Sequence, residues 1–100
     1  MTDYDAIIIG AGHNGLICAS YLAKAGKNVL VLDARNKPGG CASTREFAPG
    51  HHVSDCAQWL SQFDQSIVRD LDLKAAGLKL GKPKTTISLQ ADGDHLVLDG

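Results

Sequence analysis

Two short runs of apolar residues near the N-terminus are continuous rather than alternating, at residues 6–9 and 29–32. Strands that are buried on both faces show this pattern, so the runs predict neighbouring parallel strands covered by helices. Residues 16–24, between the two runs, have the spacing of a helix with one apolar side, and Gly26 is placed to end it. We therefore expect a βαβ unit with a right-handed crossover.

The apolar side of this first helix should pack on the sheet. Helical spacing brings Leu16 into line with Ala19 or Ser20 and then with Leu22 or Ala23. Cys18 falls in the same helix, and we expect its side chain in the core.

Two further helices are expected in the middle of the chain. Asp55 and Gln58 have the spacing of a capping box, which predicts a helix over residues 56–62. Trp59 and Phe63, four residues apart, should then pack into the core. A second helix should follow with Asp64 as its cap, Ile67, Val68 and Leu71 on its buried face and Gly77 beyond its end.

The pattern changes to alternation near residue 85. Ile87 and Leu89 alternate with polar residues, the turn signal Asp92-Gly93 follows, and residues 96–98 are apolar again. This arrangement predicts a β-hairpin.

The elements together predict an α/β fold. A Rossmann-like βαβ dinucleotide-binding unit should occupy residues 1–50, a helical segment residues 51–84 and the hairpin residues 85–100. The parallel sheet is incomplete, because only two of its strands are found and two strands leave edges and apolar faces uncovered. We expect that further chain completes the sheet, or that the chain pairs with a copy of itself.

The junction of the first strand and the first helix reads G-x-G-x-x-G, formed by Gly10, Gly12 and Gly15. Gly10 permits the tight turn, Gly12 lets a pyrophosphate approach the backbone, and Gly15 lets the helix pack close to the strand. The helix start presents N–H groups and a positive dipole end to the phosphates. Asp33, about 20 residues on, can accept hydrogen bonds from ribose hydroxyls. A glycine turn that merely closes the βαβ unit is the alternative.

Composition narrows the class of protein. The chain is 44% hydrophobic and 21% charged, as globular domains are, and its net charge of −1 with scattered basic residues argues against a nucleic-acid partner. No apolar run approaches the ~18 residues of a membrane span, and the acidic start at residues 1–5 resembles neither a signal nor a transit peptide. Three cysteines without C-x-x-C spacing indicate reduced thiols and a cytoplasmic location. No metal site is expected, since His51 and His52 have no partner ligand at useful spacing.

Residues 4–40 combine G-x-G-x-x-G, an acid and then Arg-x-x-x-Gly-Gly. This stretch resembles the N-terminal flavin-binding segment of the phytoene desaturase-like flavoproteins, which belong with the amine-oxidase-like FAD oxidoreductases. Residues 50–57 are similar to a Gly-to-Asp segment of that group, and residues 85–99 to the start of its substrate domain. Enzymes of this group are several times longer. The resemblance therefore implies an N-terminal fragment that is not catalytically competent alone and whose catalytic residues are unknown.

The resemblance implies FAD as the cofactor. The glycine turn and its peptide N–H groups would hold the pyrophosphate, and Asp33 would hold the adenosine ribose from a side chain one methylene shorter than the glutamate frequent in the family. Arg35 would lie over the adenine side or near the phosphates, and Gly39-Gly40 would bring a second stretch of backbone to the pyrophosphate. Cys41 stands where many relatives have an arginine, which removes one charged contact. The expected cofactor-binding residues are Gly10, Ala11, Gly12, Asn14, Gly15, Asp33, Arg35, Gly39 and Gly40.

Three functions remain open from the sequence. In the first, the FAD segment serves an oxidoreductase whose small-molecule substrate is apolar, as the resemblance implies. In the second, the chain is an NAD-binding protein or subunit; NADP is disfavoured because Asp33 would repel its 2′-phosphate. In the third, it is a non-catalytic module that self-associates through its open sheet edges.

Overall fold

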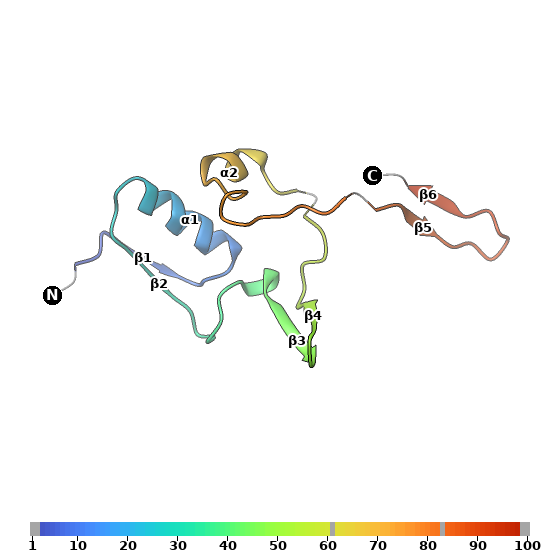
Figure 1. The fold of residues 1–100 in the computed structure, drawn as a ribbon, viewed down its shortest axis with the longest axis horizontal. Coiled ribbons are helices and arrows are strands. Elements are labelled where there is room, and N and C mark those ends of the chain that lie inside the picture. The colour runs from blue at the N-terminus through green and yellow to red at the C-terminus, as the bar shows by residue number, and fades with distance from the viewer. Residues whose placement is uncertain (1–2, 61, 83, 99–100) are drawn as a thin grey trace.

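The first half of the chain forms the expected βαβ unit. The computed structural model describes residues 3–60, 62–82 and 84–98. β1 (Ala6–Ile9) pairs in parallel with β2 (Val29–Leu32), and α1 (His13–Lys24) connects them (Figure 1). The register aligns Ala6 with Val29 and Ile9 with Leu32, so both strands end at the same level. The carboxyl ends of the strands and the start of α1 therefore meet at one edge.

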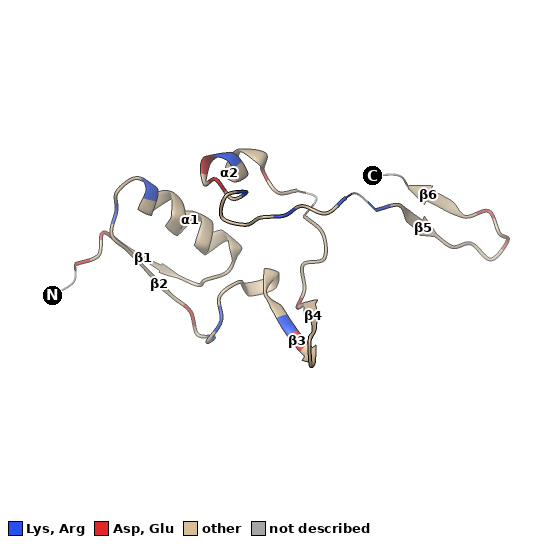
Figure 2. Cartoon of the chain, in the orientation of Figure 1, with Lys and Arg blue, Asp and Glu red and all other residues tan. Residues whose placement is uncertain are grey.

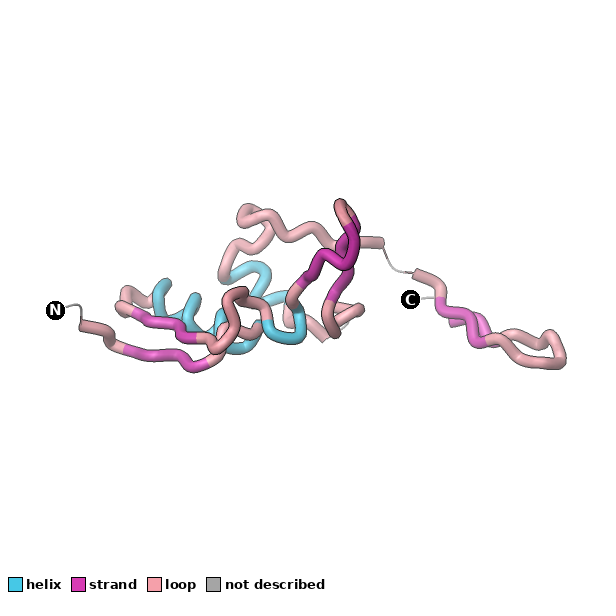
Figure 3. Tube along the Cα trace, turned by 90° about the horizontal axis from the view of Figure 1, so that it is seen from below, coloured by secondary structure: helices cyan, strands magenta, loops and turns pink. Residues whose placement is uncertain are grey.

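Helix α1 lies on one face of the two strands (Figure 3). Ala19 is buried there, whereas Cys18 is exposed, so the expectation that Cys18 lies in the core is wrong. Cys18 directly precedes the buried Ala19, and because successive side chains of a helix are rotated by about 100°, its side chain points to solvent. On β1, Ile7 and Ile9 are 57% and 88% exposed, so the sheet face away from α1 is uncovered.

Glycines set both ends of α1: the glycine turn sets its start, and Gly26 sets its end. The helix begins at His13, three residues earlier than expected, because the end of the glycine turn forms its first turn. It ends as predicted: Gly26 adopts φ +80°, and the N–H of Lys27 donates to the Leu22 carbonyl at 3.0 Å. A left-handed glycine with this bond is a frequent helix stop.

A second hairpin was not predicted from the sequence. After a single 3-10 turn (η1, Gly40–Ala42), β3 (Thr44–Ala48) pairs antiparallel with β4 (His51–Ser54), with a bulge between Glu46 and Ala48. Both strands are mostly exposed, so no apolar alternation marks them. His51 and His52 thus lie in strand β4.

The helix predicted over residues 56–62 is wrong. The described residues 57–60 form no helix, and residue 61 lies outside the described part of the chain. Asp55 does not act as a cap, because its carboxylate contacts Ser43 and Arg45 instead. Trp59, which was expected in the core, is 66% exposed.

The helix capped by Asp64 is confirmed. In α2 (Gln65–Asp70), the carboxylate of Asp64 accepts the N–H of Ser66 at 2.8 Å, and Val68 is buried. The hydroxyl of Tyr21 on α1 donates to the Asp70 carboxylate at 3.0 Å, which ties α2 to α1.

The expected C-terminal hairpin is also confirmed. β5 (Thr86–Ser88) pairs antiparallel with β6 (Leu96–Leu98), and Gly93 in the connecting turn adopts φ +87°. Figure 1 shows this hairpin at the far end of the chain from the βαβ unit. Residues 99 and 100 of the expected segment lie outside the described residues.

The α/β fold class is confirmed, with an unusually small core. The radius of gyration is 18.3 Å, whereas a compact domain of this length has about 13 Å. Within the described residues the buried apolar side chains are those of Ala11, Ala19 and Val68. Neither described α-helix has the length and apolarity needed to span a bilayer. Basic and acidic residues are scattered along the chain (Figure 2). The boundaries at residues 50 and 84 stay predictions.

Candidate functional site

The glycine turn joins β1 to α1 in a geometry that side chains would disturb. Gly10 adopts φ +104°, a conformation that residues with a Cβ rarely take. A Cβ on Gly15 would lie 2.0 Å from the carbonyl oxygen of Gly10, so the helix can approach the turn only without it. A Cβ on Gly12 would meet only the Cα of Gly40, at 3.8 Å. Gly15 thus serves packing, whereas a Cβ on Gly12 would make only an ordinary contact.

The first turn of α1 begins directly after Gly12. The first bond along the helix is donated by the N–H of Leu16 to the carbonyl of Gly12, at 2.9 Å. The N–H groups of the preceding turn, which includes Asn14 and Gly15, therefore have no acceptor further back in the helix. Together with the positive end of the helix dipole, they form a site for an anion.

Asp33 connects the end of β2 to the glycine turn. Its carboxylate accepts the N–H of Ala11 and the N–H of Arg35, each at 2.7 Å. The Arg35 N–H and then the Ala11 N–H hold the pKa of the Asp33 carboxyl below its ordinary value. Asp33 is therefore a carboxylate at neutral pH, and it fixes the turn as well as bordering the site.

A second glycine segment lies directly against the first. The N–H of Gly39 donates to the carbonyl of Ala11 at 2.7 Å, and Gly39 forms an isolated parallel bridge with Gly12. A Cβ on Gly40 would lie 2.9 Å from the Cα of Gly12, and Gly40 adopts φ +57°. The pair is therefore no separate surface turn, because it packs against the backbone of the glycine turn.

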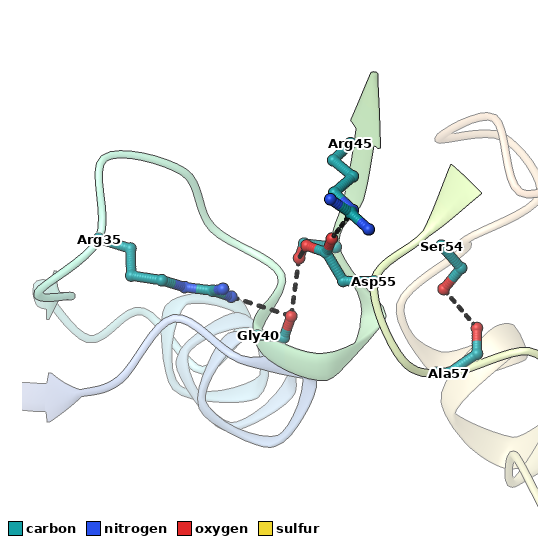
Figure 4. A network of polar contacts seen from close by, with 7 residues as sticks. Arg35, Gly40, Arg45, Ser54, Asp55 and Ala57 are labelled. Carbon is teal, nitrogen blue, oxygen red and sulfur yellow. Dashed lines mark hydrogen bonds and ion pairs between the residues drawn. The ribbon is translucent and has the colours of Figure 1, made fainter. Parts of the chain in front are cut away.

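Arg35 points to this second segment. Its guanidinium Nη2 donates to the carbonyl of Gly40 at 2.9 Å (Figure 4). The resemblance placed Arg35 over the adenine side or near the phosphates; in the structure its side chain contacts the Gly39–Gly40 segment, and its role toward a cofactor stays a prediction. Cys41, next in the chain, is exposed.

A hollow of about 460 Å³ lies at the carboxyl ends of β1 and β2. Its lining residues are Ile9, Gly10, Leu32, Asp33 and Ala34. Sequence reasoning missed the apolar members of this set, although their position as the last residues of two neighbouring strands marks the edge where α/β sheets bind ligands. The described residues hold no cluster of three His, Cys, Asp or Glu side chains suited to a metal.

The structure thus brings together the residues that were predicted separately. The turn at residues 10–15, the carboxylate of Asp33 and the pair Gly39–Gly40 meet at the start of α1. Their role in holding a cofactor stays a prediction. The geometry offers peptide N–H groups for phosphates, a charged acceptor for hydroxyls and an apolar hollow for a flat ring.

Comparison with known proteins agrees with this arrangement. Residues 8–72 match the family described as NAD(P)-binding Rossmann-like domain. Pyridine nucleotide-disulfide oxidoreductase domain-containing protein 2 of Mus musculus is 47% identical over 78 residues, 78% of this chain and 13% of that protein. A limonene dehydrogenase polypeptide of Castellaniella defragrans is 39% identical over 98 residues, 96% of this chain and 18% of that protein. Among solved structures, a triple mutant of putrescine oxidase from a redesign of cofactor binding is similar, with a TM-score of 0.67 and 30% sequence identity. The match covers 97% of this chain and 22% of the putrescine oxidase chain.

The chain therefore spans less than a fifth of the length of these curated relatives. Their names are those of oxidoreductases, and the matched part is a dinucleotide-binding domain, so the resemblance to the dinucleotide-binding segment of an oxidoreductase is confirmed. The family match covers most of the chain and includes the glycine turn, Asp33 and the second glycine pair. The chain belongs to the NAD(P)-binding Rossmann-like domain family.

Proposed function

We propose that this chain is the FAD-binding segment of a larger flavin-dependent oxidoreductase. The observation that carries the proposal is the contact of two glycine segments at the start of α1, where Gly39 donates to Ala11 and Gly40 packs on Gly12. The two segments meet at the start of α1, beside its first turn. A pyrophosphate fits such a place because it needs peptide N–H donors and close backbone approach.

Each part of the site has a role in this proposal. The N–H groups at the start of α1 bind the pyrophosphate, and Asp33 accepts hydrogen bonds from the adenosine ribose. Its two oxygens each accept one N–H in the structure, and a carboxylate has about four acceptor positions in all, so two remain for hydroxyls. The hollow beside Ile9 and Leu32 has apolar walls for the adenine ring.

FAD is favoured over nicotinamide cofactors by the second glycine segment. Gly39–Gly40 adds backbone to the phosphate site, which the flavoproteins resembled by this sequence use and nicotinamide enzymes do not need. NADP is disfavoured further, because a carboxylate at Asp33 would repel its 2′-phosphate. NAD remains the second candidate, since the matched family is described as NAD(P)-binding.

Bound FAD would supply the capacity to accept a hydride equivalent from the substrate. The residues of this chain bind and orient its adenosine diphosphate part, and the reacting groups belong to the longer protein. We propose an apolar substrate, because the family resemblance implies one and because one relative is named for limonene. A cytoplasmic location, inferred from the unpaired cysteines, belongs to the same proposal.

Titration of the chain with FAD, followed by flavin fluorescence, tests the proposal through Asp33. Asp33→Ala should raise the Kd roughly tenfold to a hundredfold, the usual range for a lost hydrogen bond to a charged group. Asp92→Ala, in the exposed β5–β6 turn, is the matched control and should leave the Kd unchanged. Equal Kd values for the parent chain and Asp33→Ala would reject the ribose role, and tighter binding of NADH than of FAD would favour the second candidate.

A further inference from the structure

A polar network joins the second glycine segment to the unpredicted β3–β4 hairpin (Figure 4). The carbonyl of Gly40 accepts from Arg35 on one side, at 2.9 Å, and lies 2.8 Å from the hydroxyl of Ser43 on the other. The same hydroxyl lies 2.5 Å from a carboxylate oxygen of Asp55. Asp55 is thus one side chain away from the backbone that borders the phosphate site.

Asp55 holds Ser43 at two points. Its carboxylate contacts the Ser43 hydroxyl, and its N–H donates to the Ser43 carbonyl at 2.9 Å. The second bond continues the β3–β4 ladder, in which Thr44 pairs with Ser54. The side chain and the backbone of Ser43 are therefore both fixed, which places its hydroxyl beside Gly40.

The ion pair of Asp55 has a smaller part in this network. Arg45 Nε lies 3.1 Å from the second carboxylate oxygen, but the Arg45 side chain is 68% exposed, against 29% for Asp55. Exposed ion pairs of this kind contribute little, because solvent screens them. The contact orients the carboxylate. The Ser43 hydroxyl has one proton and two acceptors within reach, the Gly40 carbonyl and the Asp55 carboxylate, so it donates to one of them at a time; the carboxylate acts on the glycines by fixing where this hydroxyl lies.

The Gly39–Gly40 segment lies outside the strands, apart from one bridge between Gly39 and Gly12. Both glycines have positive φ values, +121° and +57°. We propose that Asp55 is a positioning residue for the phosphate site, acting through Ser43 to hold Gly39–Gly40 against the glycine turn. The assignment of this site to phosphate rests on the proposed function; the positioning itself is a property of the chain.

Amide hydrogen exchange at Gly39, measured by NMR on the 100-residue chain, tests the positioning without any ligand. The Gly39 N–H is bonded to Ala11, so loosening of the segment should speed its exchange. Ser43→Ala and Asp55→Ala should each do so, while the Gly10 amide, bonded to Leu32 in the sheet, keeps its rate. Asp55→Asn retains an acceptor oxygen and should restore most of the protection.

The matched control is Ser54→Ala. It removes a hydroxyl from the same hairpin, but this hydroxyl contacts Ala57 and not Gly40, so Gly39 exchange should keep the parent rate. The FAD Kd should rise about two- to tenfold in Ser43→Ala, the factor for one hydrogen bond. Adding Asp55→Ala should raise it no further, because both changes act on one contact.

The outcomes separate the two proposals. If the parent chain does not bind FAD but Gly39 exchange responds as described, the proposed function falls and the positioning stands. Unchanged Gly39 exchange in both Ser43→Ala and Asp55→Ala would overturn the positioning. So would a parent chain whose Gly39 amide exchanges at the rate of an unprotected peptide.

Discussion

Replacement of Gly15 by alanine should destabilise the βαβ unit. The new methyl carbon would lie 2.0 Å from the Gly10 carbonyl oxygen, far closer than real Cβ contacts allow, and 3.3 Å from Cγ2 of Ile8. The obstructing atom is backbone, and the Gly10 N–H is bonded to Leu32, so the turn cannot simply move aside. Overpacking of this kind costs about 1–3 kcal/mol, and the better helix propensity of alanine offsets at most ~1 kcal/mol. Because the obstructing atom is backbone, we place the cost in the upper part of that range, at about 2–3 kcal/mol, and expect a net loss of about 1–2 kcal/mol in the free energy of unfolding.

Urea unfolding followed by far-ultraviolet circular dichroism measures this loss. Gly12→Ala is the matched control, because its Cβ would meet only the Gly40 Cα at 3.8 Å, and it should stay within about 0.5 kcal/mol of the parent. A Gly15→Ala chain as stable as the parent would refute the packing argument. Equal destabilisation by both changes would refute the division of roles between the two glycines.

Three further predictions concern charge, capping and exposure. The pKa of Asp33 is lowered in the folded chain, so the carboxylate stabilises the fold fully above its unfolded pKa of about 3.9, and this stabilisation is lost as the pH falls through the folded pKa. In Asp33→Asn, the urea concentration at the unfolding midpoint should therefore fall less steeply as the pH is lowered. Asp64→Ala should speed amide exchange at Ser66, which loses its acceptor; an unchanged rate would contradict the cap. A thiol reagent should modify three cysteines in the native chain at the rate seen in urea, and a protected thiol would contradict the exposure of Cys18, Cys41 and Cys56.

The elements that the sequence predicted are those with local signals. β1, α1 and β2 follow from two apolar runs and a glycine turn, and Asp64 caps α2 through the N–H of a residue two positions on. These features depend on neighbours in the chain, so composition and spacing suffice to find them.

The elements that it did not predict depend on distant contacts. Asp55 has the spacing of a helix cap, but the β3–β4 pairing brings Ser43 to it, and bonds to Ser43 and Arg45 replace the cap. Arg35 likewise turns to the Gly40 carbonyl because the second glycine segment packs on the first. Tertiary contacts of this kind override local preference, and no local pattern records them.

Binding of FAD to the parent chain and to Gly12→Ala, measured by flavin fluorescence under conditions where both chains are equally folded, tests the central claim most directly. The Cβ introduced by Gly12→Ala would lie on the glycine turn, 3.8 Å from the Cα of Gly40, where the proposal places the pyrophosphate. We expect saturable binding to the parent chain and its loss in Gly12→Ala. Equal FAD affinity for the two chains would contradict the claim that the glycine turn holds the cofactor.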